Sequence, residues 1–456
     1  MPTIDPQKQR EFATQVVARL HKEGYIAYWA GGCVRDMILG LPPKDYDVAT
    51  NATPREVRRL FGRRRTLLVG AVFGVVTVLG PREAGQIEVA TFRRDAAYTD
   101  GRHPDAVTFS SPEEDAARRD FTINGMFYDP LAHRVIDLVE GRRDLDRRLL
   151  RAIGDPKARF AEDKLRMLRS VRFAASYDLA LEPGTFKAMA DMADQVNIVS
   201  AERIAQEMRL ILVHASRARA MELLRETGLL GALLPEVVPM IGLPQHKPRQ
   251  PGGDLWQHTL LVLELLKPPS FSLALAALLH DVGKPNSPPD SEDRPALGGH
   301  ELVGANLAAE ICRRWRLSKK ERQHAVWLVR HHMIPSRARQ MRWPALQRIL
   351  ISPGIVDLLD LAAANAEATD GDMSSVEYCR QLCRLPKETL NPAPLVSGHD
   401  LMRHGVPQGK IIKRLLDQVR DAQLDKQVCT QHEALSLVDR LLAERLIDTE
   451  PSDEKS

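Results

Sequence analysis

Cysteine is scarce in this sequence and lacks the spacing that disulfides or zinc sites use. Five cysteines occur in 456 residues, and no two of them form a C-x-x-C pair. An odd number without paired spacing disfavours a disulfide framework, and the lack of C-x-x-C disfavours a zinc knuckle. We therefore expect no functional role for the thiols.

Long apolar runs are missing as well. No stretch approaches the roughly 18 apolar residues that a membrane-spanning helix needs. The first thirty residues also lack the cationic segment and the following apolar segment of a secretory signal peptide. We therefore expect a cytoplasmic protein without a membrane partner.

Neither charge of one sign nor aromatic residues are abundant. Lys and Arg number 64 against 60 Asp and Glu, a formal net charge of +4, and aromatic residues make up 5% of the chain. This excess fits an RNA partner only where basic residues cluster, as in FGRRR at 61–65. With few aromatic side chains available for stacking, an RNA is expected to be recognised by its backbone and shape.

The hydrophobic pattern divides the chain into a β-rich part and a helical part. Apolar residues recur with a helical period of about 3.6 from Asp155 onward. A helix is expected over 5–23, and strands in IAYWAGG (26–32), DYDVAT (45–50), GVVTVLG (74–80), IEVATF (87–92) and VIDLVEG (135–141). The polar segment at 94–117 is expected to be a long loop that orders around nucleotide and RNA 3′ end. The pattern predicts an α+β fold, an N-terminal mixed β-sheet with helices followed by largely all-α regions.

Asp45 and Asp47 lie two residues apart in a predicted strand. Residues with this spacing point to the same face, about 6–7 Å apart along the backbone, which suits the bridging of divalent metals. Gly31 and Gly32, at a strand-to-helix junction, let backbone N–H groups approach a triphosphate, aided by Arg35. A D-x-D motif by itself is more often two solvated acids than a metal site. The surrounding sequence must decide between these two interpretations.

Four blocks in fixed order supply that context. They are GGCVRDMILGLPPKDYDVAT (31–50), IEVATFRRDAAYTDGRHP (87–104), RRDFTINGMFYD (118–129) and RFAEDKLRMLRSVRFAA (159–175). With these blocks the sequence resembles the class II nucleotidyltransferases, which comprise CCA-adding tRNA nucleotidyltransferases and bacterial poly(A) polymerases. The resemblance covers 25–215 closely and 394–416 more weakly. It implies that Asp45 and Asp47 bind Mg²⁺, that Glu88 completes the acidic cluster, and that Gly32 and Arg35 contact the triphosphate.

The third block implies a ribose-binding set that selects NTP over dNTP. Arg119, Asp120 and Asn124 combine a phosphate-binding guanidinium with groups that bond a ribose hydroxyl. Gly125 departs from the alanine that is usual in the family. In isolation the same residues more often form a surface salt-bridge cluster.

The fourth block implies a protein template for the incoming base. Asp163, Arg166 and Arg169 are spaced three apart on one side of a predicted helix, and Arg172 extends the row towards phosphate. In the resemblance, the Asp163 and Arg166 pair bonds the Watson–Crick edge of cytosine or adenine and rejects guanine and uracil. Without the resemblance, a solvated salt bridge is the more common explanation.

A second constellation consists of histidines in the carboxyl-terminal half. Its members are His258, His280, Asp281, His300, His331 and His332. An adjacent His-Asp after an apolar helix resembles an HD metal-dependent phosphohydrolase domain, which implies Mn²⁺, Ni²⁺ or Fe²⁺ at His258, His280 and Asp281. Asn365 stands where the family has its closing Asp, so either Asp360 or Asp370 substitutes or the metal is lost.

These observations lead to one interpretation with three alternatives. The chain is expected to add CCA, or part of it, to the 3′ end of tRNA from CTP and ATP with Mg²⁺. The alternatives are a poly(A) polymerase or A-adding enzyme, an HD phosphohydrolase with a vestigial nucleotidyltransferase domain, and a non-catalytic RNA-binding protein. The expected domains are a catalytic head (1–150), a helical neck (151–245), an HD domain (246–385) and a C-terminal tRNA-binding tail (386–456).

Overall fold

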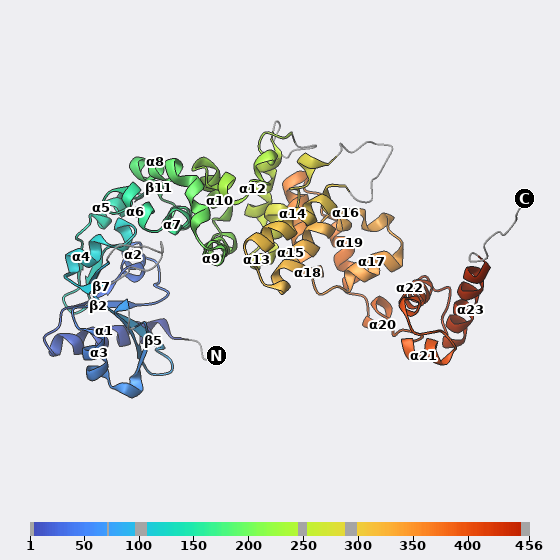
Figure 1. Cartoon of the computed structure of the whole chain (residues 1–456), viewed down its shortest axis with the longest axis horizontal. Helices are drawn as coiled ribbons and strands as arrows, with labels where there is room; N and C mark the ends of the chain where they lie inside the picture. The colour runs from blue at the N-terminus through green and yellow to red at the C-terminus, as the bar shows by residue number, and fades with distance from the viewer. Residues whose placement is uncertain (1–3, 71–72, 96–106, 245–252, 288–298, 448–456) are drawn as a thin grey trace, which may run out of the picture. The chain divides into compact units, whose positions relative to one another are not determined.

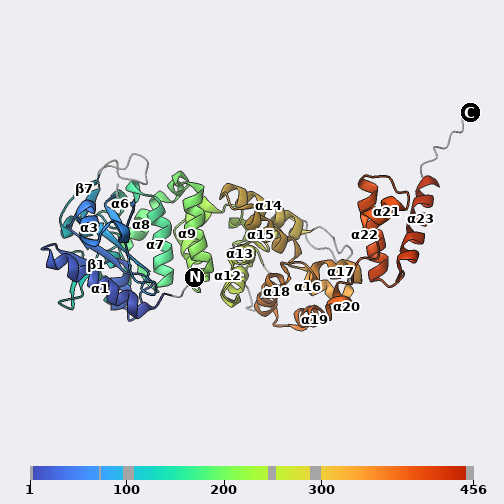
Figure 2. The same cartoon turned by 90° about the horizontal axis from the view of Figure 1, so that it is seen from below.

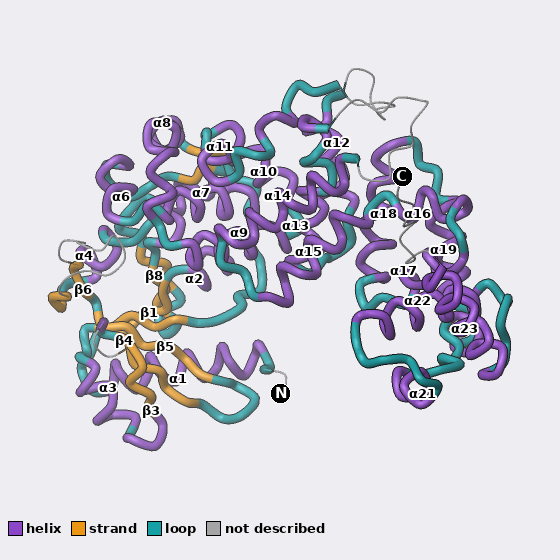
Figure 3. Tube along the Cα trace, turned by 45° about the vertical axis from the view of Figure 1, so that its right-hand side comes forward, coloured by secondary structure: helices purple, strands orange, loops and turns teal. Residues whose placement is uncertain are grey.

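The computed structural model describes residues 4–70, 73–95, 107–244, 253–287 and 299–447. Its contacts divide the chain into two compact units. Unit 1 comprises 1–241 and 310–318, and unit 2 comprises 242–309 and 319–456. Within the described residues every strand lies in unit 1, and unit 2 is helical (Figure 3). The expected α+β organisation is confirmed.

A seven-stranded mixed sheet forms the first part of unit 1. Its order is β3-β4-β5-β2-β1-β8-β9, in which β2 and β5 pair parallel and the other described neighbours pair antiparallel. The strands are β1 (Ala27–Ala30), β2 (Asp47–Thr50), β3 (Thr66–Gly70), β4 (Val75–Leu79), β5 (Gln86–Thr91), β8 (Phe127–Asp129) and β9 (Arg134–Ile136). Because β2 and β5 are parallel neighbours, their amino-terminal ends lie side by side at the same end of the sheet.

The five expected β-rich runs overlap β1, β2, β4, β5 and β9, the last only at Val135 and Ile136, but they do not include β3 and β8. In β3, Leu67, Leu68 and Val69 follow one another on an exposed edge, so no alternation of apolar and polar residues marks the strand. Strand β8 has only three residues. Both strands are defined by their neighbours in the sheet more than by their own sequence.

The expectation of one long loop over 94–117 is wrong in its described parts. Strand β6 (Arg93–Asp95) pairs with β7 (Val107–Phe109), and α4 (Pro112–Ala117) follows. Ser111 caps α4 by accepting from the Glu114 backbone N–H. The remaining residues, 96–106, lie outside the described part of the chain.

Helices α1 (Pro6–Lys22), α2 (Gly32–Ile38) and α3 (Pro54–Phe61) pack against the sheet (Figure 1). Helix α1 confirms the helix expected over 5–23. The Asp5 side chain accepts the first free backbone N–H groups, and Pro6 occupies the first turn. Val16, Val17 and Leu20 form its buried face.

Short helices and a small two-stranded sheet complete unit 1. They are α5 (Gly141–Asp146), β10 (Leu149–Leu150), α6 (Pro156–Glu162), α7 (Leu165–Ser176), β11 (Ala180–Leu181), α8 (Pro183–Met192), α9 (Ala201–Val213), α10 (Arg217–Glu226) and α11 (Leu229–Leu233). The single helix expected around Asp163 is wrong, because Asp163 has extended backbone angles and separates α6 from α7. Its carboxylate accepts from the N–H of Leu165, the first residue of α7, at 3.1 Å.

Unit 2 is helical, and α13 is the buried helix at the centre of its first part. The helices are α12 (Leu255–Leu265), α13 (Phe271–Leu279), α14 (His300–Arg314), whose last residues belong to unit 1, α15 (Lys319–His331), α16 (Ile334–Arg337), α17 (Trp343–Leu350), α18 (Ile355–Thr369), α19 (Ser374–Cys383), α20 (Lys387–Leu390), α21 (Gly398–Arg403), α22 (Lys410–Leu424) and α23 (Gln431–Ile447). Every residue of α13 is buried, and the helix packs against α12, α15 and α18. His280 and Asp281 follow α13 directly, so the apolar helix fixes their position.

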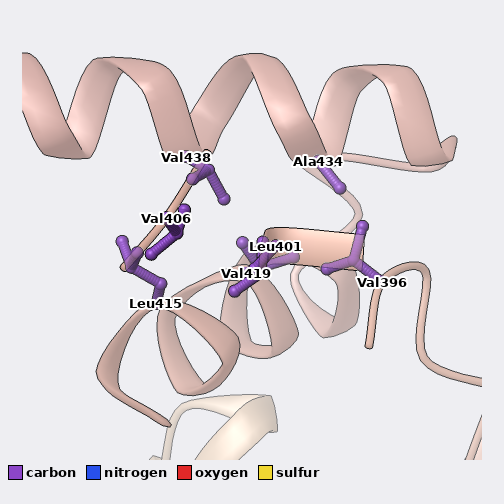
Figure 4. Close-up of a cluster of buried hydrophobic side chains, with 7 residues drawn as sticks. All are labelled: Val396, Leu401, Val406, Leu415, Val419, Ala434 and Val438. Carbon is purple, nitrogen blue, oxygen red and sulfur yellow. The ribbon is translucent and has the colours of Figure 1, made fainter. Parts of the chain in front are cut away.

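The last three helices share a small apolar core. Helices α22 and α23 lie side by side (Figure 2). Figure 4 shows their buried side chains pointing toward one another and toward those near α21: Val396, Leu401, Val406, Leu415, Val419, Ala434 and Val438.

In the described part of the chain, no single helix combines the length and apolar content needed to cross a membrane. One pair, α17 with α18, meets both criteria only when its two helices, bent by 102°, are taken together.

Gly141 provides a test of how tightly α5 packs against the backbone at Thr122. A Cβ at Gly141 would lie 2.2 Å from the Thr122 carbonyl oxygen, a contact that the backbone must relieve by shifting. Overpacking of this kind typically costs 1–3 kcal/mol, so we expect Gly141→Ala to lower the apparent melting temperature by roughly 2–12 °C in calorimetry. Gly231→Ala in α11 is the control, because its nearest neighbour is 3.9 Å away. Equal melting temperatures for both variants would contradict this packing.

Candidate functional site

Three carboxylates lie close together at the amino-terminal ends of the neighbouring strands β2 and β5. Asp47 is the first residue of β2 and pairs in parallel register with Glu88 of β5, so both side chains leave the sheet on the same face. Asp45 precedes the strand and does not lie within it, which corrects the expectation that one strand carries both aspartates. Burial, Asp45 and Glu88 raise the pKa of Asp47 to about 7, although Arg119 lowers it.

This acidic group fits a divalent metal. Asp47 reaches solvent, yet the surrounding protein still desolvates its carboxylate, and two neighbouring acids repel its charge. A hard divalent cation with oxygen ligands relieves both penalties, and Mg²⁺ is the common cation of this type at phosphate-binding sites. The donor set is therefore that of a site for a hard divalent cation.

A cavity of about 440 Å³ opens beside Asp47. Its lining residues are Gly31, Gly32, Asp47, Arg93, Arg118, Arg119, Asp120, Asn124, Asp163, Leu165, Arg166, Arg169 and Arg203. The cavity brings together residues expected from three separate sequence blocks. Of the other expected site residues, Asp45, Glu88, Arg35 and Arg172 do not line it.

Glycine allows the chain to turn tightly at the cavity wall. Gly31 has φ +73°, and a Cβ at this position would lie 3.0 Å from the Arg119 Nη1. Any other residue would therefore be strained and would displace Arg119. Gly32, the next residue, begins α2.

Arg35 lies behind the cavity and holds other residues in place. Its side chain is buried, donates to Asp36 at 2.9 and 2.7 Å, and also bonds the Tyr177 hydroxyl. Its Nη1 donates to the Asn124 Oδ1 at 2.6 Å. The described arrangement therefore connects Arg35 to the site through Asn124, and its expected contact with triphosphate stays a prediction.

The ribose-binding set expected from the third block is held by opposite charges. Arg169 donates to one Asp120 oxygen at 2.9 and 2.6 Å, and Asn124 donates to the other at 3.1 Å. Burial raises the pKa of Asp120, but Arg169 and these hydrogen bonds outweigh it and hold the pKa below its ordinary value. Asp115, buried beneath, binds Arg119 and keeps it at the cavity wall.

Asp163 and Arg166 line the same cavity but do not pair with each other. Asp163 accepts two hydrogen bonds from Arg203, at 3.1 and 2.7 Å. Arg166 donates to Glu162 and to the Arg159 carbonyl oxygen. The i,i+3 salt bridge that the spacing alone favours does not form among the described contacts, because the helix ends at Asp163 and its carboxylate is directed to Arg203 of α9.

Two charged residues of α9 are missing from the sequence-based site. Arg203 binds Asp163, and Glu207, one turn later on the same helix, accepts from Arg172 at 2.7 Å. Arg172 is thereby directed to α9 and not to the cavity. The i,i+4 spacing of Arg203 and Glu207 is the only signal that could have marked this face of α9, and it is common on solvated helices.

The histidines of unit 2 converge on Asp281. The buried members are His258, His280, Asp281, His300 and His332. Two overlapping groups are close enough to hold a metal, His258 with His280 and Asp281, and Asp281 with His300 and His332. Burial is the main cause that lowers the pKa of His332, and it lowers the pKa of His258 to about 4. Both side chains are therefore neutral at pH 7. His331 belongs to neither group, and its Nδ1 lies 2.7 Å from the Trp327 carbonyl oxygen.

Asn365 lies in contact with this cluster. Its Oδ1 is 2.9 Å from the His258 Nε2. Of the two suggested substitutes, Asp360 pairs with Arg380 at 3.6 Å. Asp370 lines a second cavity of about 390 Å³, together with Asp281 and Asn365.

The raised pKa of Asp47 predicts how stability depends on pH without metal. The folded carboxyl holds its proton up to about pH 7, against an ordinary pKa of 3.8. The stability that this proton contributes is present below pH 3.8 and is lost as the pH rises through 7. We expect Asp47→Asn in EDTA to melt at a higher temperature than wild type at pH 8, with the difference shrinking towards pH 4. Asp146→Asn, at an exposed site, is the control, and a pH-independent difference would contradict the assignment.

Three family models match successive parts of the chain. A Poly A polymerase head domain matches residues 27–151, a probable RNA and SrmB-binding site of polymerase A matches 178–241, and an HD domain matches 255–365.

Similar proteins agree with this order. The CCA-adding enzyme of Lactobacillus gasseri is 32% identical over 427 residues, covering 93% of this chain and 95% of the relative. Poly(A) polymerase I of Haemophilus influenzae is 37% identical over 244 residues, and the CCA-adding enzyme of Geobacillus stearothermophilus 42% over 224; these alignments cover 51% and 49% of this chain. They span about half the length of each relative, 53% and 54% respectively.

Solved structures match over nearly the whole chain. The Bacillus stearothermophilus CCA-adding enzyme in complex with CTP has a TM-score of 0.70 at 28% identity, covering 96% of this chain and 98% of that one. The Thermotoga maritima CCA-adding enzyme complexed with tRNA has the same fold, with a TM-score of 0.56 at 18% identity and coverage of 97% of each chain. The chain belongs to the class II nucleotidyltransferase family that comprises the CCA-adding enzymes and the bacterial poly(A) polymerases, and it carries an HD domain.

Proposed function

We propose that the chain adds CCA, or part of it, to the 3′ end of tRNA from CTP and ATP in the cytoplasm. The observation that carries this proposal is the acidic group of Asp45, Asp47 and Glu88 beside an arginine-lined cavity. The near full-length relative from Lactobacillus gasseri is a CCA-adding enzyme, and the Bacillus structure contains CTP.

In the proposed reaction the RNA 3′-hydroxyl oxygen attacks the α-phosphorus of the nucleotide. A P–O bond forms, the bond to the bridging oxygen of the β-phosphate breaks, and pyrophosphate leaves as the hydroxyl proton passes to solvent. The family implies a divalent metal, and Asp45, Asp47 and Glu88 would hold Mg²⁺, which supplies charge neutralisation at the hydroxyl and at the leaving group. Arg119, held by Asp115, lies at the cavity wall to bind phosphate oxygens.

The other cavity residues are proposed to select the nucleotide. Asp120 and Asn124, fixed by Arg169 and Arg35, would bond the ribose hydroxyls. Asp163 and Arg166 would bond the base edge. Because Arg203 already holds Asp163 in one orientation, a base with a mismatched pattern leaves buried polar groups unpaired.

A poly(A) polymerase is the nearest alternative, since a relative of comparable identity has that activity. Incubation with tRNA lacking one, two or three terminal nucleotides, with each labelled NTP in turn, separates the two. Addition that stops after CCA supports the proposal. Long adenosine tails, or no addition to any of these tRNAs, would overturn it.

The four sequence-based domains are part of this proposal. Family models that begin at 27, 178 and 255 support a catalytic head at 1–150, a neck at 151–245 and an HD domain at 246–385. The compact helices after residue 395 support a separate tail at 386–456. The tRNA is proposed to lie along the helical regions.

A second function is proposed for unit 2, a metal-dependent phosphohydrolase centred on Asp281. The buried imidazoles around Asp281 adjoin the 390 Å³ cavity, which is also lined by Lys284. Imidazole and carboxylate ligands suit Mn²⁺ or Ni²⁺, and an ammonium group suits a phosphate ester. Hydrolysis of a 2′,3′-cyclic phosphate or phosphomonoester by the metal-loaded full chain is the test.

Removal of either aspartate tests the transfer site. We expect Asp45→Ala and Asp47→Ala to lower kcat at least ~10³-fold with little change in tRNA binding, because stabilisation of charge on the transferred phosphate is lost. Asp146→Ala, an exposed aspartate of the same unit, should retain full turnover. The measurement is single-turnover addition of labelled CMP, and near-normal rates in either site variant would refute the assignment.

Selection of the base is tested at the wall formed by Asp163 and Arg166. We expect Asp163→Ala and Arg166→Ala to reduce discrimination against UTP and GTP by ~5–150-fold, since each lost hydrogen-bond pair is worth ~1–3 kcal/mol. Lys164→Ala is the matched control, because Lys164 lies between them in sequence, does not line the cavity and donates to the Ala161 carbonyl oxygen. If both variants incorporate the four nucleotides in wild-type ratio, base selection resides in other residues.

A further inference from the structure

Two exposed phenylalanines lie together on the surface of unit 1. Among the described residues, Phe73 and Phe109 are the only Phe, Tyr or Trp side chains that are exposed, at 37% and 45%. Every other aromatic side chain in the described part of the chain is buried or half-buried. Single apolar side chains scattered over a surface are common, whereas a pair of neighbouring exposed rings is a candidate binding surface.

The hairpin of β6 and β7 brings the two phenylalanines together. Phe109 of β7 pairs in antiparallel register with Arg93 of β6, so these two side chains leave the hairpin on the same face. The Arg93 Nη1 donates to the Phe73 carbonyl oxygen. At Gly74, the next residue, a Cβ would lie 3.4 Å from the Phe109 Cε1. The two phenylalanines are therefore neighbours beside Arg93.

Arg93 connects this aromatic pair to the candidate transfer site. It lines the 440 Å³ cavity together with Asp47 and Arg119. Its backbone N–H donates to the Asp115 Oδ1 at 3.3 Å, and the other oxygen of Asp115 binds Arg119. The two phenylalanines are not among the lining residues themselves. The aromatic pair therefore lies at the rim of the cavity, next to its arginines.

An acceptor RNA at this cavity needs a contact that does not depend on base identity. Under the proposed function, the base at the RNA 3′ end changes with each addition, while Asp163 and Arg166 bond the incoming base. Hydrogen bonds to the edge of the terminal base would favour one RNA end and reject the next. Stacking on an aromatic ring tolerates every base, because every base has a π-face.

We propose that Phe73 and Phe109 form a stacking surface for the unpaired base at the 3′ end of the acceptor RNA. The proposal rests on the proposed function, which brings the RNA 3′-hydroxyl to Asp47. Arg93 and Arg94 adjoin the surface, and the Arg94 side chain is 67% exposed. Guanidinium groups next to a stacked base suit the phosphates of the same strand, so the surface fits RNA better than an apolar protein partner.

This surface adds one contact to the recognition expected from the composition. Because aromatic residues are few, the sequence predicts that RNA is recognised by its backbone and shape. A single stacked base at the reactive end is compatible with that prediction, since it needs only the two exposed rings. It holds the terminal nucleotide where the RNA strand enters the cavity.

The test compares RNA ends with and without a base. The full-length chain is titrated, in the absence of nucleotides, with fluorescently labelled tRNA that lacks CCA and ends either in a normal nucleotide or in an abasic one. In wild type, removal of the base should weaken binding by ~5–150-fold, the range for loss of one stacked base. In the double variant Phe73→Ala with Phe109→Ala, this difference should fall to within about 2-fold, because the ring and the base are partners and their losses do not add.

Variants that keep the apolar volume or the ring serve as controls. Phe109→Tyr retains the ring and should bind both RNA ends as wild type does. Leu131→Ala, at a side chain that is 44% exposed between β8 and β9, should leave the difference unchanged. Phe73→Leu replaces Phe73→Ala if the melting temperature shows that the smaller residue unfolds unit 1.

The outcomes separate this proposal from the proposed function. Equal binding of the two RNA ends by wild type, or an unchanged difference in the double variant, would overturn the stacking surface. The second result is also the one expected if the rings serve a protein partner. A base-dependent difference that disappears in the double variant, found in a chain that adds no nucleotide, would remove the transfer reaction and still support the stacking surface.

Discussion

A carboxylate taken out of water must be neutralised by a nearby cation, and both units are arranged around that requirement. In unit 1, Asp115, Asp120 and Asp163 each bind at least one arginine. The exception lies at the amino-terminal ends of β2 and β5. Among the described contacts, Asp47 and its acidic neighbours have no arginine or lysine within ion-pair distance there. In unit 2, Lys284 neutralises one oxygen of Asp281. The carboxylate oxygens left without a cation mark the places where a metal fits.

The arginines also hold the residues around the 440 Å³ cavity in place before any ligand binds. Arg169 and Arg203 reach from α7 and α9 to Asp120 and Asp163, so residues from distant sequence blocks share one wall. Fixing these side chains in advance reduces the conformational entropy lost on binding and raises the free energy of a mismatched base. Under the proposed function, rigidity of this wall would contribute to selectivity together with the groups that touch the base.

Local patterns predicted the parts of this site that depend on local geometry. The D-x-D spacing placed Asp45 close to Asp47, although only Asp47 lies in the strand, and the family resemblance placed Glu88 beside them; the parallel pairing of β2 with β5 brings Glu88 opposite Asp47. The helix break at Asp163 was not predictable in this way, since its hydrogen bond with the Leu165 N–H and its ion pair with Arg203 depend on packing between α7 and α9. Arg35 was likewise identified by its motif, but its burial against Asn124 depends on residues 89 positions away. The sequence identified the histidines, but it could not show that they form two groups around Asp281, because this depends on how their helices pack.

The segment 310–318 has a consequence for how the chain can be divided. It belongs to unit 1, where Trp315 is buried and Arg314 binds Glu236 at 2.6 and 2.9 Å. The chain thus leaves unit 1 at residue 241, returns for nine residues, and leaves again. A protease cut or a gene truncation near residue 241 would not release two complete folding units, because the amino-terminal fragment would lack a tryptophan from its own core. Unit 1 is therefore not contained in an amino-terminal piece of the chain that ends near residue 241.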